Sequence, residues 1–415
     1  MLNNTEKYQN HNIRLGLYGE YFDIESLKKK AELFQNTRIL HINSVKRGGG
    51  VAAILSHIVP LFNDIGILNH WWVPQIPESN FFQITKRQHN MLQGIDDGIL
   101  SDTEQSIYWE TQKHVAGMVK KHIGEYDFVV IHDTQYLGIV KFLEKRKPKI
   151  LYRCHIDTSA PNPFIYNFFM PVLRSCDATI YHLPEFVLKG SPDPFFLLPS
   201  VDPFDPKNNI SAVSRGFIRE TIKNLGLDPS RAILLQVGRF DPAKGFEDVC
   251  DVFRQLKLEF SDLQLLLTGS GAADDPEFYT YIEVIKNKVR GINDVVVKEL
   301  PFDVLKLNAV QQAATIVYAL SKKEGFGLVV SEASIKKKPV IVTDVGGLPE
   351  QVLQGKTGFI VKNVDEAVEK SRFLLSNRQV REAMGERGRK YILSRFITPV
   401  HVENYLKIFY HVMER

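Results

Sequence analysis

Short apolar runs alternate along the chain with longer segments whose apolar residues recur at helical spacing. This alternation is typical of βαβ units and predicts an α/β protein with parallel sheets. Several runs are nearly continuous in valine, isoleucine and leucine, as expected for strands covered on both faces. The first half predicts strands at Thr37–Asn43, Asn69–Val73, Asp127–His132, Ile150–His155, Asp177–His182 and Phe195–Leu198. The second half predicts strands at Ala232–Val237, Leu263–Leu267, Asp294–Lys298, Thr315–Tyr318, Val340–Thr343 and Gly358–Val361.

A segment rich in proline, aspartate and asparagine, Pro199–Asn209, separates the two groups of strands. Proline cannot donate a hydrogen bond to a strand and it restricts the residue before it, so this segment is interpreted as a linker. From about Glu382 onward, apolar residues again recur at helical spacing. We therefore predict two α/β domains, residues 1–205 and 206–390, followed by a helical segment at 391–415.

Composition and charge narrow the class of protein further. Of the 415 residues, 44% are hydrophobic and 24% are charged, which are ordinary values for a globular protein. The net charge of +4 is too small to predict nucleic acid as a partner. No apolar run reaches the roughly 18–20 residues that cross a bilayer, and the N-terminus lacks the apolar core of a secretion signal. Three widely spaced cysteines, with no CxxC spacing, favour a reduced cytoplasm.

Three glycines after the first predicted strand form the first candidate site. Gly48, Gly49 and Gly50 lie between that strand and a predicted helix. Glycine lets the backbone approach a ligand closely, and the free N–H groups at a helix start favour anions or polar oxygens. Pro60 is expected to end or kink the helix. The G-x-G-x-x-G spacing of dinucleotide-binding turns is absent, and a tight loop without a ligand is the alternative interpretation.

A loop with two cations follows the first strand of the second half. The sequence QVGRFDPAKG places Gly238, Arg239 and Lys244 directly after the strand Ala232–Val237. Open α/β sheets bind ligands at the carboxyl ends of their strands. An arginine fork and a lysine point charge can together clamp a diphosphate. The alternative is an ordinary charged surface loop.

A Gly-Phe-Gly turn precedes a predicted helix in the sequence EGFGLVVSEA. The turn occupies residues 325–327, and the helix is predicted over Leu328–Lys336. Backbone N–H groups at such a helix start can bind phosphate oxygens. Glu324 precedes the turn and Glu332 lies on the helix, and each carboxylate can accept hydrogen bonds from sugar or ribose hydroxyls. Together with the loop that carries the two cations, this arrangement favours a nucleotide-sugar ligand.

The glycine loop, GRFDPAKG and EGFGLVVSEA together resemble the retaining nucleotide-sugar glycosyltransferases of family 4. The resemblance extends from His41 over nearly the whole chain. It implies the GT-B architecture, with two facing Rossmann-like domains and a C-terminal helix, at 391–415, that returns to the first domain. A finer match is to the trehalose glycosyltransferring synthase group. It rests on the stretches HINSVKRGGGVAAILSHIVPLFNDIGI, FFQITKRQHNMLQG, HDTQ, YRCHIDTSAPN, YHLPEF and LPSVDP.

The resemblance implies a role for each candidate residue. It assigns Arg239 and Lys244 to the leaving-group diphosphate, Glu324 to the donor sugar, and His155 to a position beside that sugar. It implies further donor contacts at Gly49, Gly50, Gly238, Phe326, Gly327, Leu328 and Glu332, the last of these on the ribose. The acceptor-side candidates are Gly48, Asp133 and Asp157. His132 and His182, which also end predicted strands, are secondary candidates, and the acidic segment at 271–276 fits either a nucleotide contact or surface charge.

These residues predict a reaction without a metal or a cofactor, in which a nucleoside-diphosphate sugar is the donor substrate. No H-E-x-x-H, D-x-D or Cys/His cluster of ligand spacing occurs in the sequence. The resemblance implies front-face attack, in which the departing phosphate oxygen takes the proton of the acceptor. The expected reaction is reversible glucosyl transfer from UDP-, ADP- or GDP-glucose to glucose, which gives trehalose and a nucleoside diphosphate.

Other functions stay open on the sequence alone. A family-4 enzyme could use a polyol, a sugar phosphate or a lipid-linked sugar as acceptor, and Lys46, Arg47, Lys86 and Arg87 keep a sugar phosphate in view. A nicotinamide oxidoreductase and a non-catalytic nucleotide-sugar-binding module are two further alternatives. The donor base and the oligomeric state, with a homodimer as one option, are not predicted.

Overall fold

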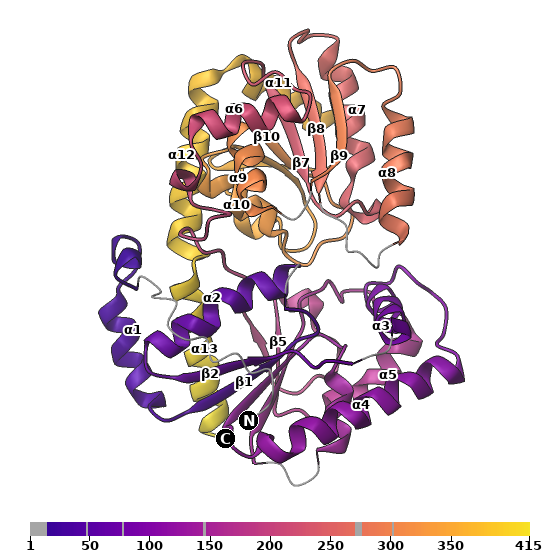
Figure 1. The fold of residues 1–415 in the computed structure, drawn as a ribbon, viewed down its shortest axis with the longest axis vertical. Helices are drawn as coiled ribbons and strands as arrows, with labels where there is room; N and C mark the ends of the chain where they lie inside the picture. The colour runs from indigo at the N-terminus through magenta and orange to yellow at the C-terminus, as the bar shows by residue number, and fades with distance from the viewer. Residues whose placement is uncertain (1–14, 47–48, 77–78, 144–146, 270–275, 301–302) are drawn as a thin grey trace. The chain divides into compact units, whose positions relative to one another are not determined.

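The chain folds into two compact units (Figure 1). The structure, a computed structural model, describes residues 15–46, 49–76, 79–143, 147–269, 276–300 and 303–415. Unit 1 comprises Met1–Ser200 and Thr398–Arg415, and unit 2 comprises Val201–Ile397. The predicted domain boundaries, at residues 205 and 390, differ from the boundaries between the two units by a few residues each.

The segment that was interpreted as a linker, Pro199–Asn209, lies mostly within unit 2 as ordered turns. Its own acidic and amide side chains satisfy its backbone: Asn208 Nδ2 donates to Asp202 O at 2.9 Å. Asn308 Nδ2 also donates to the carbonyls of Pro206 and Asn209, each at 2.7 Å. The prolines do exclude regular structure, as predicted, but these side-chain bonds hold the segment against unit 2.

Unit 1 is built on a parallel six-stranded sheet in the order β2-β1-β3-β4-β5-β6. Its strands are β1 Arg38–Ile42, β2 Leu68–Trp72, β3 Phe128–His132, β4 Lys149–Arg153, β5 Ala178–Tyr181 and β6 Pro194–Phe196. Its α-helices are α1 Ile24–Ala31, α2 Gly50–Asp64, α3 Ser79–Leu92, α4 Asp102–Ile123, α5 Pro163–Leu173 and α13 Thr398–Met413. Its 3₁₀ helices are η1 Leu15–Glu20, η2 Glu32–Phe34, η3 Leu137–Phe142 and η4 Pro184–Phe186.

Hydrophobic clusters cover both faces of this sheet, and strands β1 to β5 each contribute to both clusters because successive side chains of a strand point to opposite faces. On β3, Val129 and Ile131 belong to one hydrophobic cluster, and Phe128 and Val130 belong to the other. Helix α13 completes the second cluster, since the Phe409 ring centroid lies 4.5 Å from that of Phe128. The predicted return of a C-terminal helix to the first domain is confirmed in α13. This helix starts at Thr398 rather than 391, because α12 runs on to Arg395.

The expectation that Pro60 ends or kinks its helix is wrong as to the ending, since α2 continues four residues further, to Asp64. Proline removes one backbone donor from a helix and crowds the preceding turn. Here Pro60 and the adjacent Val59 and Leu61 are all buried. Burial of this apolar surface stabilises the helix enough to keep it continuous through the proline.

Unit 2 holds a second parallel six-stranded sheet, in the order β12-β11-β10-β7-β8-β9. Its strands are β7 Ile233–Val237, β8 Gln264–Gly269, β9 Val295–Glu299, β10 Ile316–Ala319, β11 Val340–Thr343 and β12 Gly358–Val361. Its α-helices are α6 Arg215–Asn224, α7 Phe246–Lys257, α8 Pro276–Lys288, α9 Val304–Ala313, α10 Leu328–Ile335, α11 Val364–Ser376 and α12 Arg378–Arg395. Its 3₁₀ turns are η5 Ile210–Ala212, η6 Pro242–Lys244 and η7 Pro349–Gln351. On the central strand β10, Ile316 and Tyr318 face one cluster, and Val317 and Ala319 face the other.

The strand predictions are confirmed: every predicted strand is present, and its ends lie within two residues of the predicted ones. One of these small differences matters for the candidate site. Strand β4 ends at Arg153, so His155 lies in the loop that follows the strand and not in the strand itself. Within the described ranges, no helix is long and apolar enough to cross a membrane.

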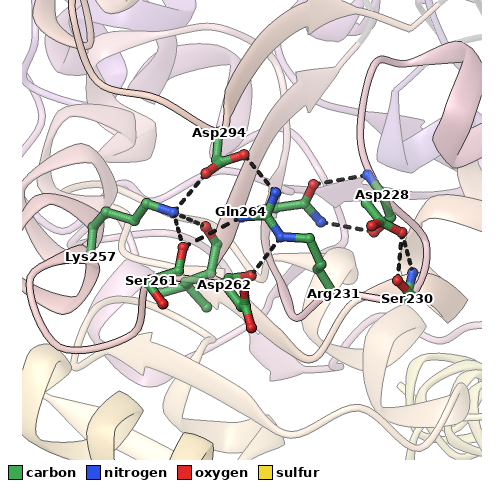
Figure 2. A network of polar contacts seen from close by, with 9 residues as sticks. Asp228, Ser230, Arg231, Lys257, Ser261, Asp262, Gln264 and Asp294 are labelled. Atoms are coloured by element: carbon green, nitrogen blue, oxygen red, sulfur yellow. Dashed lines mark hydrogen bonds and ion pairs between the residues drawn. The ribbon is translucent and has the colours of Figure 1, made fainter.

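A polar network at the amino end of the unit 2 sheet joins three strands and a helix (Figure 2). Asp294, just before β9, accepts from Arg231 Nη1 at 2.8 Å and from Lys257 Nζ at 2.7 Å. Its backbone carbonyl accepts from the N–H of Leu265 on β8 at 2.9 Å. The hydrogen bonds from Arg231 and Lys257 hold the pKa of the Asp294 carboxyl far below its usual value. The ionised carboxylate therefore ties β9 to α7 and to the start of β7.

We expect Asp294→Asn to lower the free energy of unfolding by about 1–2 kcal/mol at pH 7, because two charge-assisted bonds are lost. A carboxyl whose pKa is depressed by folding contributes stability above its unfolded pKa, near 4, and loses it as the pH falls further. The difference between wild type and variant should thus shrink below about pH 4. Urea unfolding at about pH 7, 4 and 3 measures this. Asp262→Asn is the control, since Asp262 accepts from Arg231 through its backbone carbonyl; an equal loss in both variants would contradict the assignment.

Candidate active site

The loop after β7 carries the two predicted phosphate-clamp cations. Asp241 starts η6 by accepting from the N–H of Ala243 at 2.8 Å. Gly245 ends η6 with a φ of +67°, and a Cβ there would lie 1.8 Å from the carbonyl oxygen of Leu320. The N–H of Lys322 donates to Ala243 O at 2.7 Å. The loop after β7 is therefore held against the segment after β10. This places Lys244 beyond the carboxyl ends of these two adjacent strands.

Lys244 and Glu324 lie in direct contact beyond these strand ends. Lys244 Nζ donates to Glu324 Oε2 at 2.8 Å, and Ser321 Oγ donates to the same oxygen at 3.1 Å. The Glu324 side chain is 13% exposed and the Lys244 side chain is 27% exposed, so the pair is only partly shielded from solvent. The structure thus brings together one predicted cation and one predicted carboxylate from segments 80 residues apart in sequence.

Arg239 pairs within its own loop. Its Nη2 donates to Asp241 Oδ2 at 2.7 Å, and its side chain is 46% exposed. Burial opposes the ionisation of Asp241, but the amide of Ala243 and the guanidinium of Arg239 outweigh this effect and hold the pKa of the carboxyl below its usual value. Arg239 therefore lies within reach of solvent, next to Gly238 at the end of β7, with Asp241 fixing one side of its guanidinium.

The Gly-Phe-Gly turn leads directly into α10. Gly327 has a φ of +79°, and a Cβ there would lie 2.4 Å from Leu348 Cδ2, so only glycine fits without rearrangement. Gln351 Nε2 donates to the carbonyl of Phe326 at 2.6 Å. The N-cap residue Gly327 has no side chain to cap α10, and Gln351 Oε1 accepts from the N–H of Ser331 at 3.0 Å, so among the described residues the N–H groups of Leu328 and Val329 are the ones that can serve as anion donors.

Phe326 contributes its backbone to this turn and its ring to the core. The ring is 4% exposed and lies 5.8 Å, between centroids, from the ring of Phe396. Its predicted role, a backbone contact to phosphate, needs only the main chain, and the buried ring anchors the turn. The sequence did not reveal Gln351, whose amide binds the turn's carbonyls, because it lies 25 residues further along the chain.

Glu332 is buried and both of its carboxylate oxygens have partners. Oε1 accepts from Lys207 Nζ at 2.5 Å, and Oε2 accepts from Gln311 Nε2 at 3.0 Å. Beneath it, Lys336 Nζ donates to the carbonyl of Glu332 at 3.2 Å, and burial lowers the pKa of Lys336 to about 7. The predicted ribose contact therefore requires Lys207 to share or leave this carboxylate. Lys207 and Gln311 carry no motif in the sequence that could have indicated them.

In unit 1 the glycine loop starts α2. Gly49 is the N-cap residue with a φ of +79°, and Gly50 is the first residue of the helix. Gly48 and Arg47 lie outside the described residues, as does most of the predicted segment at 271–276. Within the described ranges no group of three histidine, cysteine, aspartate or glutamate residues is arranged to hold a metal ion.

The predicted acceptor-side carboxylates both accept hydrogen bonds from backbone N–H groups, Asp133 from the loop after β4 and Asp157 from its own loop. Asp133, with a φ of +55°, accepts from the N–H of His155 at 2.8 Å through Oδ1. Burial raises the pKa of Asp133 to about 7. Asp157 Oδ1 accepts from the N–H of Ser159 at 2.9 Å. Asp133 therefore positions the backbone of His155, and both acids are buried.

A line of imidazoles runs across the sheet of unit 1. His41 Nδ1 lies 2.9 Å from His132 Nε2, and His132 Nδ1 lies 2.8 Å from His155 Nε2. His182 lies beside this line, with its ring centroid 5.4 Å from that of His155. The secondary candidates His132 and His182 thus surround His155, whereas His41 was missed. The available signal was that β1, β3 and β5 each have a histidine at or next to their carboxyl end.

A fully buried arginine lies among these rings. Arg153, at the end of β4, donates from Nη2 to the carbonyl of Leu197 at 2.9 Å. Its guanidinium carbon lies 5.5 Å from the ring centroid of Tyr405 on α13. Burial first, and the charge of Arg153 second, lower the pKa of His155 well below its usual value. The imidazole of His155 is therefore neutral near pH 7.

Sequence comparison decides the family. The family model described as "Trehalose synthase, N-terminal domain" matches residues 41–188, and "Glycosyl transferases group 1" matches residues 217–391. A trehalose synthase from Thermococcus litoralis is 39% identical over 389 residues, which cover 93% of each chain. This chain belongs to the trehalose synthase family of glycosyltransferases. A second family member, from Rubrobacter xylanophilus, is 36% identical and covers 96% of this chain and 94% of its own.

The fold of this trehalose synthase family member is GT-B. An α,α-trehalose 6-phosphate synthase from Burkholderia multivorans has a TM-score of 0.75 with 14% sequence identity, and the match covers 91% of this chain and 99% of that one. At that identity the likeness concerns the fold alone. The chain is a hexosyltransferase, as the sequence motifs predicted.

Proposed function

We propose that this chain transfers a glucosyl group, with retention of its anomeric configuration, from a nucleoside-diphosphate glucose to free glucose, giving trehalose and the nucleoside diphosphate. The observation that carries the proposal is the Lys244–Glu324 pair beside the start of α10. A cation, a carboxylate and the N–H groups of Leu328 and Val329 thus lie beyond the carboxyl ends of the adjacent strands β7 and β10. The relatives called trehalose synthase, which match more than nine-tenths of this chain, support trehalose as the product.

Stabilising the departing diphosphate is the main demand of this reaction, because that group gains charge as the bond to the sugar breaks. In the proposal Lys244 supplies a point charge, Arg239 supplies a planar fork, and the first N–H groups of α10 supply fixed dipoles. These groups are already oriented before the substrate binds, through Asp241, Gly245 and Gln351. The reaction as proposed therefore needs neither a metal ion nor a cofactor.

The covalent step exchanges one bond at the anomeric carbon for another on the same face. The bond between that carbon and the diphosphate oxygen breaks, and the acceptor hydroxyl oxygen bonds to the carbon. The acceptor proton passes to the departing phosphate oxygen, so no residue of the chain has to be a base. Glu324 accepts hydrogen bonds from hydroxyls of the donor sugar, and Lys244 balances its charge.

Free glucose is preferred over a sugar phosphate as the proposed acceptor. Arg87 is one of the basic residues that could have bound a sugar phosphate, but its guanidinium already pairs with two carboxylates. Its Nε donates to Asp96 at 2.9 Å and its Nη1 to Glu104 at 2.9 Å. Two acidic partners on one guanidinium leave little net positive charge there to attract a second anion.

Incubation of the protein with glucose and UDP-, ADP- or GDP-glucose, in separate reactions, tests the proposal. We expect an α,α-1,1-linked disaccharide and one equivalent of nucleoside diphosphate, both identified by NMR, with at least one donor. A parallel reaction with excess chelator should run at the same rate, and trehalose with the nucleoside diphosphate should regenerate the donor.

The outcomes separate the parts of the proposal. Nucleoside diphosphate released without the disaccharide would refute glucose as the acceptor, and a disaccharide phosphate formed from glucose 6-phosphate alone would replace it. A rate lost with chelator and restored by magnesium would refute metal independence. Glu324→Gln is the matched control for contaminating activity, because it keeps the size of the side chain and removes its charge.

A further inference from the structure

Four polar side chains form an unbroken line across unit 1, one from each of four adjacent strands or the loop that follows. Asn69 Nδ2 on β2 lies 3.3 Å from His41 Nε2 on β1. From there the line continues through His132, at the end of β3, to His155, after β4. The first three side chains are at most 2% exposed, whereas His155 is partly exposed. The line therefore begins in the core and ends at a residue that is partly open to solvent.

Each ring in the line is neutral near pH 7. Burial lowers the pKa of His41 to about 3. Burial, together with the neighbouring rings and Arg153, lowers the pKa of His132 and His155 well below the usual value. A neutral imidazole carries one N–H, so one nitrogen donates and the other accepts. When such rings are joined nitrogen to nitrogen, the tautomer of one ring fixes the tautomer of the next.

The amide of Asn69 sets the direction of the whole line. Its Nδ2 faces His41, while no described residue bonds its Oδ1. The described orientation leaves one N–H and the carbonyl of this amide without a described partner, whereas the reverse orientation would leave both N–H groups buried without an acceptor, and a buried unbonded N–H is less tolerated than an unbonded carbonyl. His41 Nε2 therefore accepts and its Nδ1 carries the proton. The same assignment then passes to His132 and to His155.

We propose that Asn69, His41 and His132 are positioning residues that hold His155 in the tautomer with its proton on Nδ1. His155 Nε2 is occupied as an acceptor within the line, and Nδ1–H is the group that remains for a ligand. His155 then donates a hydrogen bond and does not act as a base. This inference rests on the proposed function for the identity of the ligand oxygen, a hydroxyl of the transferred sugar.

This role fits the reaction proposed above. The acceptor proton leaves with the phosphate oxygen, so a base beside the sugar is not needed, and a fixed donor orients a hydroxyl without a proton transfer. Asp133 holds the backbone of the same residue by accepting from its N–H at 2.8 Å. The ring of His155 is thus fixed by His132, and its backbone is fixed by Asp133.

Nitrogen-15 NMR of the full-length protein with labelled histidine tests the inference, because Nδ1–H and Nε2–H tautomers give distinct patterns of long-range coupling to the ring protons. The His155 signals are assigned by their loss in His155→Gln. We expect the proton on Nδ1 of His155 in the wild-type protein. A proton on Nε2, or an even mixture of tautomers, would overturn the proposal. The spectrum reports the tautomer whether or not the protein makes trehalose, so its failure differs from failure of the proposed function.

Asn69→Leu tests the role of the amide, because leucine has a similar size and no polar group. We expect His155, two rings away, to become a mixture of tautomers, and turnover to fall about two- to tenfold. The matched control is Asn162→Leu, at a buried asparagine of unit 1 that bonds Asp96 O and Gly98 O. It should leave the His155 signals unchanged. An unchanged His155 spectrum in folded Asn69→Leu would refute the role of Asn69, and the wild-type spectrum decides the tautomer if that variant does not fold.

Discussion

Replacing Lys244 with methionine is expected to lower the turnover number about 100- to 1,000-fold at saturating donor, because a preoriented cation on a leaving group carries a large share of the catalysis. Lys244 is placed by η6 and by Gly245, so the methionine side chain should occupy the same path without its charge. The change also leaves the Glu324 carboxylate with Ser321 as its described partner. Initial rates of nucleoside-diphosphate release measure the loss.

Two companion variants make this prediction specific. Lys286→Met removes an exposed lysine of the same unit, which pairs with Glu283 at 2.7 Å, and should keep wild-type turnover. Lys244→Arg restores the charge and should recover part of the lost rate. Turnover of Lys244→Met within threefold of wild type would show that the cation does not act on the leaving group.

Replacing Gly245 with alanine is expected to cost about 3–5 kcal/mol of stability in unit 2, because two penalties combine at this position. The backbone has a φ of +67°, which alanine adopts only with strain, and the new Cβ would lie 1.8 Å from the carbonyl oxygen of Leu320. The loop after β7 or the end of β10 must move. Lys244, the preceding residue, moves with it, so activity should fall as well.

Gly226→Ala separates the two penalties. Its φ is +92°, but no described atom lies within 4 Å of the new Cβ, so the strain acts there without the clash and should cost about 1–2 kcal/mol. Hydrogen exchange of peptides from β7 and β10 measures unit 2. Fluorescence of Trp71, Trp72 and Trp109 follows unit 1, where all three lie. Equal losses in the two variants would show that the contact with Leu320 has no effect.

The sheets could be predicted from the sequence because their strands are buried on both faces. A run such as FVVIH, at Phe128–His132, is apolar at nearly every position, and this signal does not depend on what packs against it. Pro60 shows where the same reasoning fails. The cost of a proline inside a helix could be expected from the sequence, but the burial of Pro60 that offsets this cost depends on the folded structure around it.

The donor-side candidates could be located because each lies in a short motif after a strand. The residues that bind these candidates could not be predicted from the sequence. Lys207 is separated from Glu332 by 125 residues, and its sequence surroundings, rich in proline and asparagine, indicated only a linker. Similarly, Asp133 and Asp157 were placed correctly in loops after strands, but a sequence does not tell whether a carboxylate will face a ligand or a backbone N–H of its own or a neighbouring loop.

The line of histidines illustrates the remaining gap. His41 and His132 are 91 residues apart, and each taken alone is more simply explained as a buried residue at a strand end. Only the strand order, in which β1 pairs with β3, brings their rings together. Strand order is a property of the whole fold, and it converts three unremarkable histidines into one connected group.

Helix α13 also determines the order in which the chain can fold during synthesis. Unit 2 is one continuous stretch, Val201–Ile397, whereas unit 1 needs residues from both sides of it. Val402, Tyr405 and Phe409 fill the cluster under β1 and β3, and they leave the ribosome only after all of unit 2. The unit that is translated second is therefore the first that can complete its core. Until α13 arrives, Phe62 and Phe128 lack the ring of Phe409 as a partner, and the nascent unit 1 must tolerate an open apolar face.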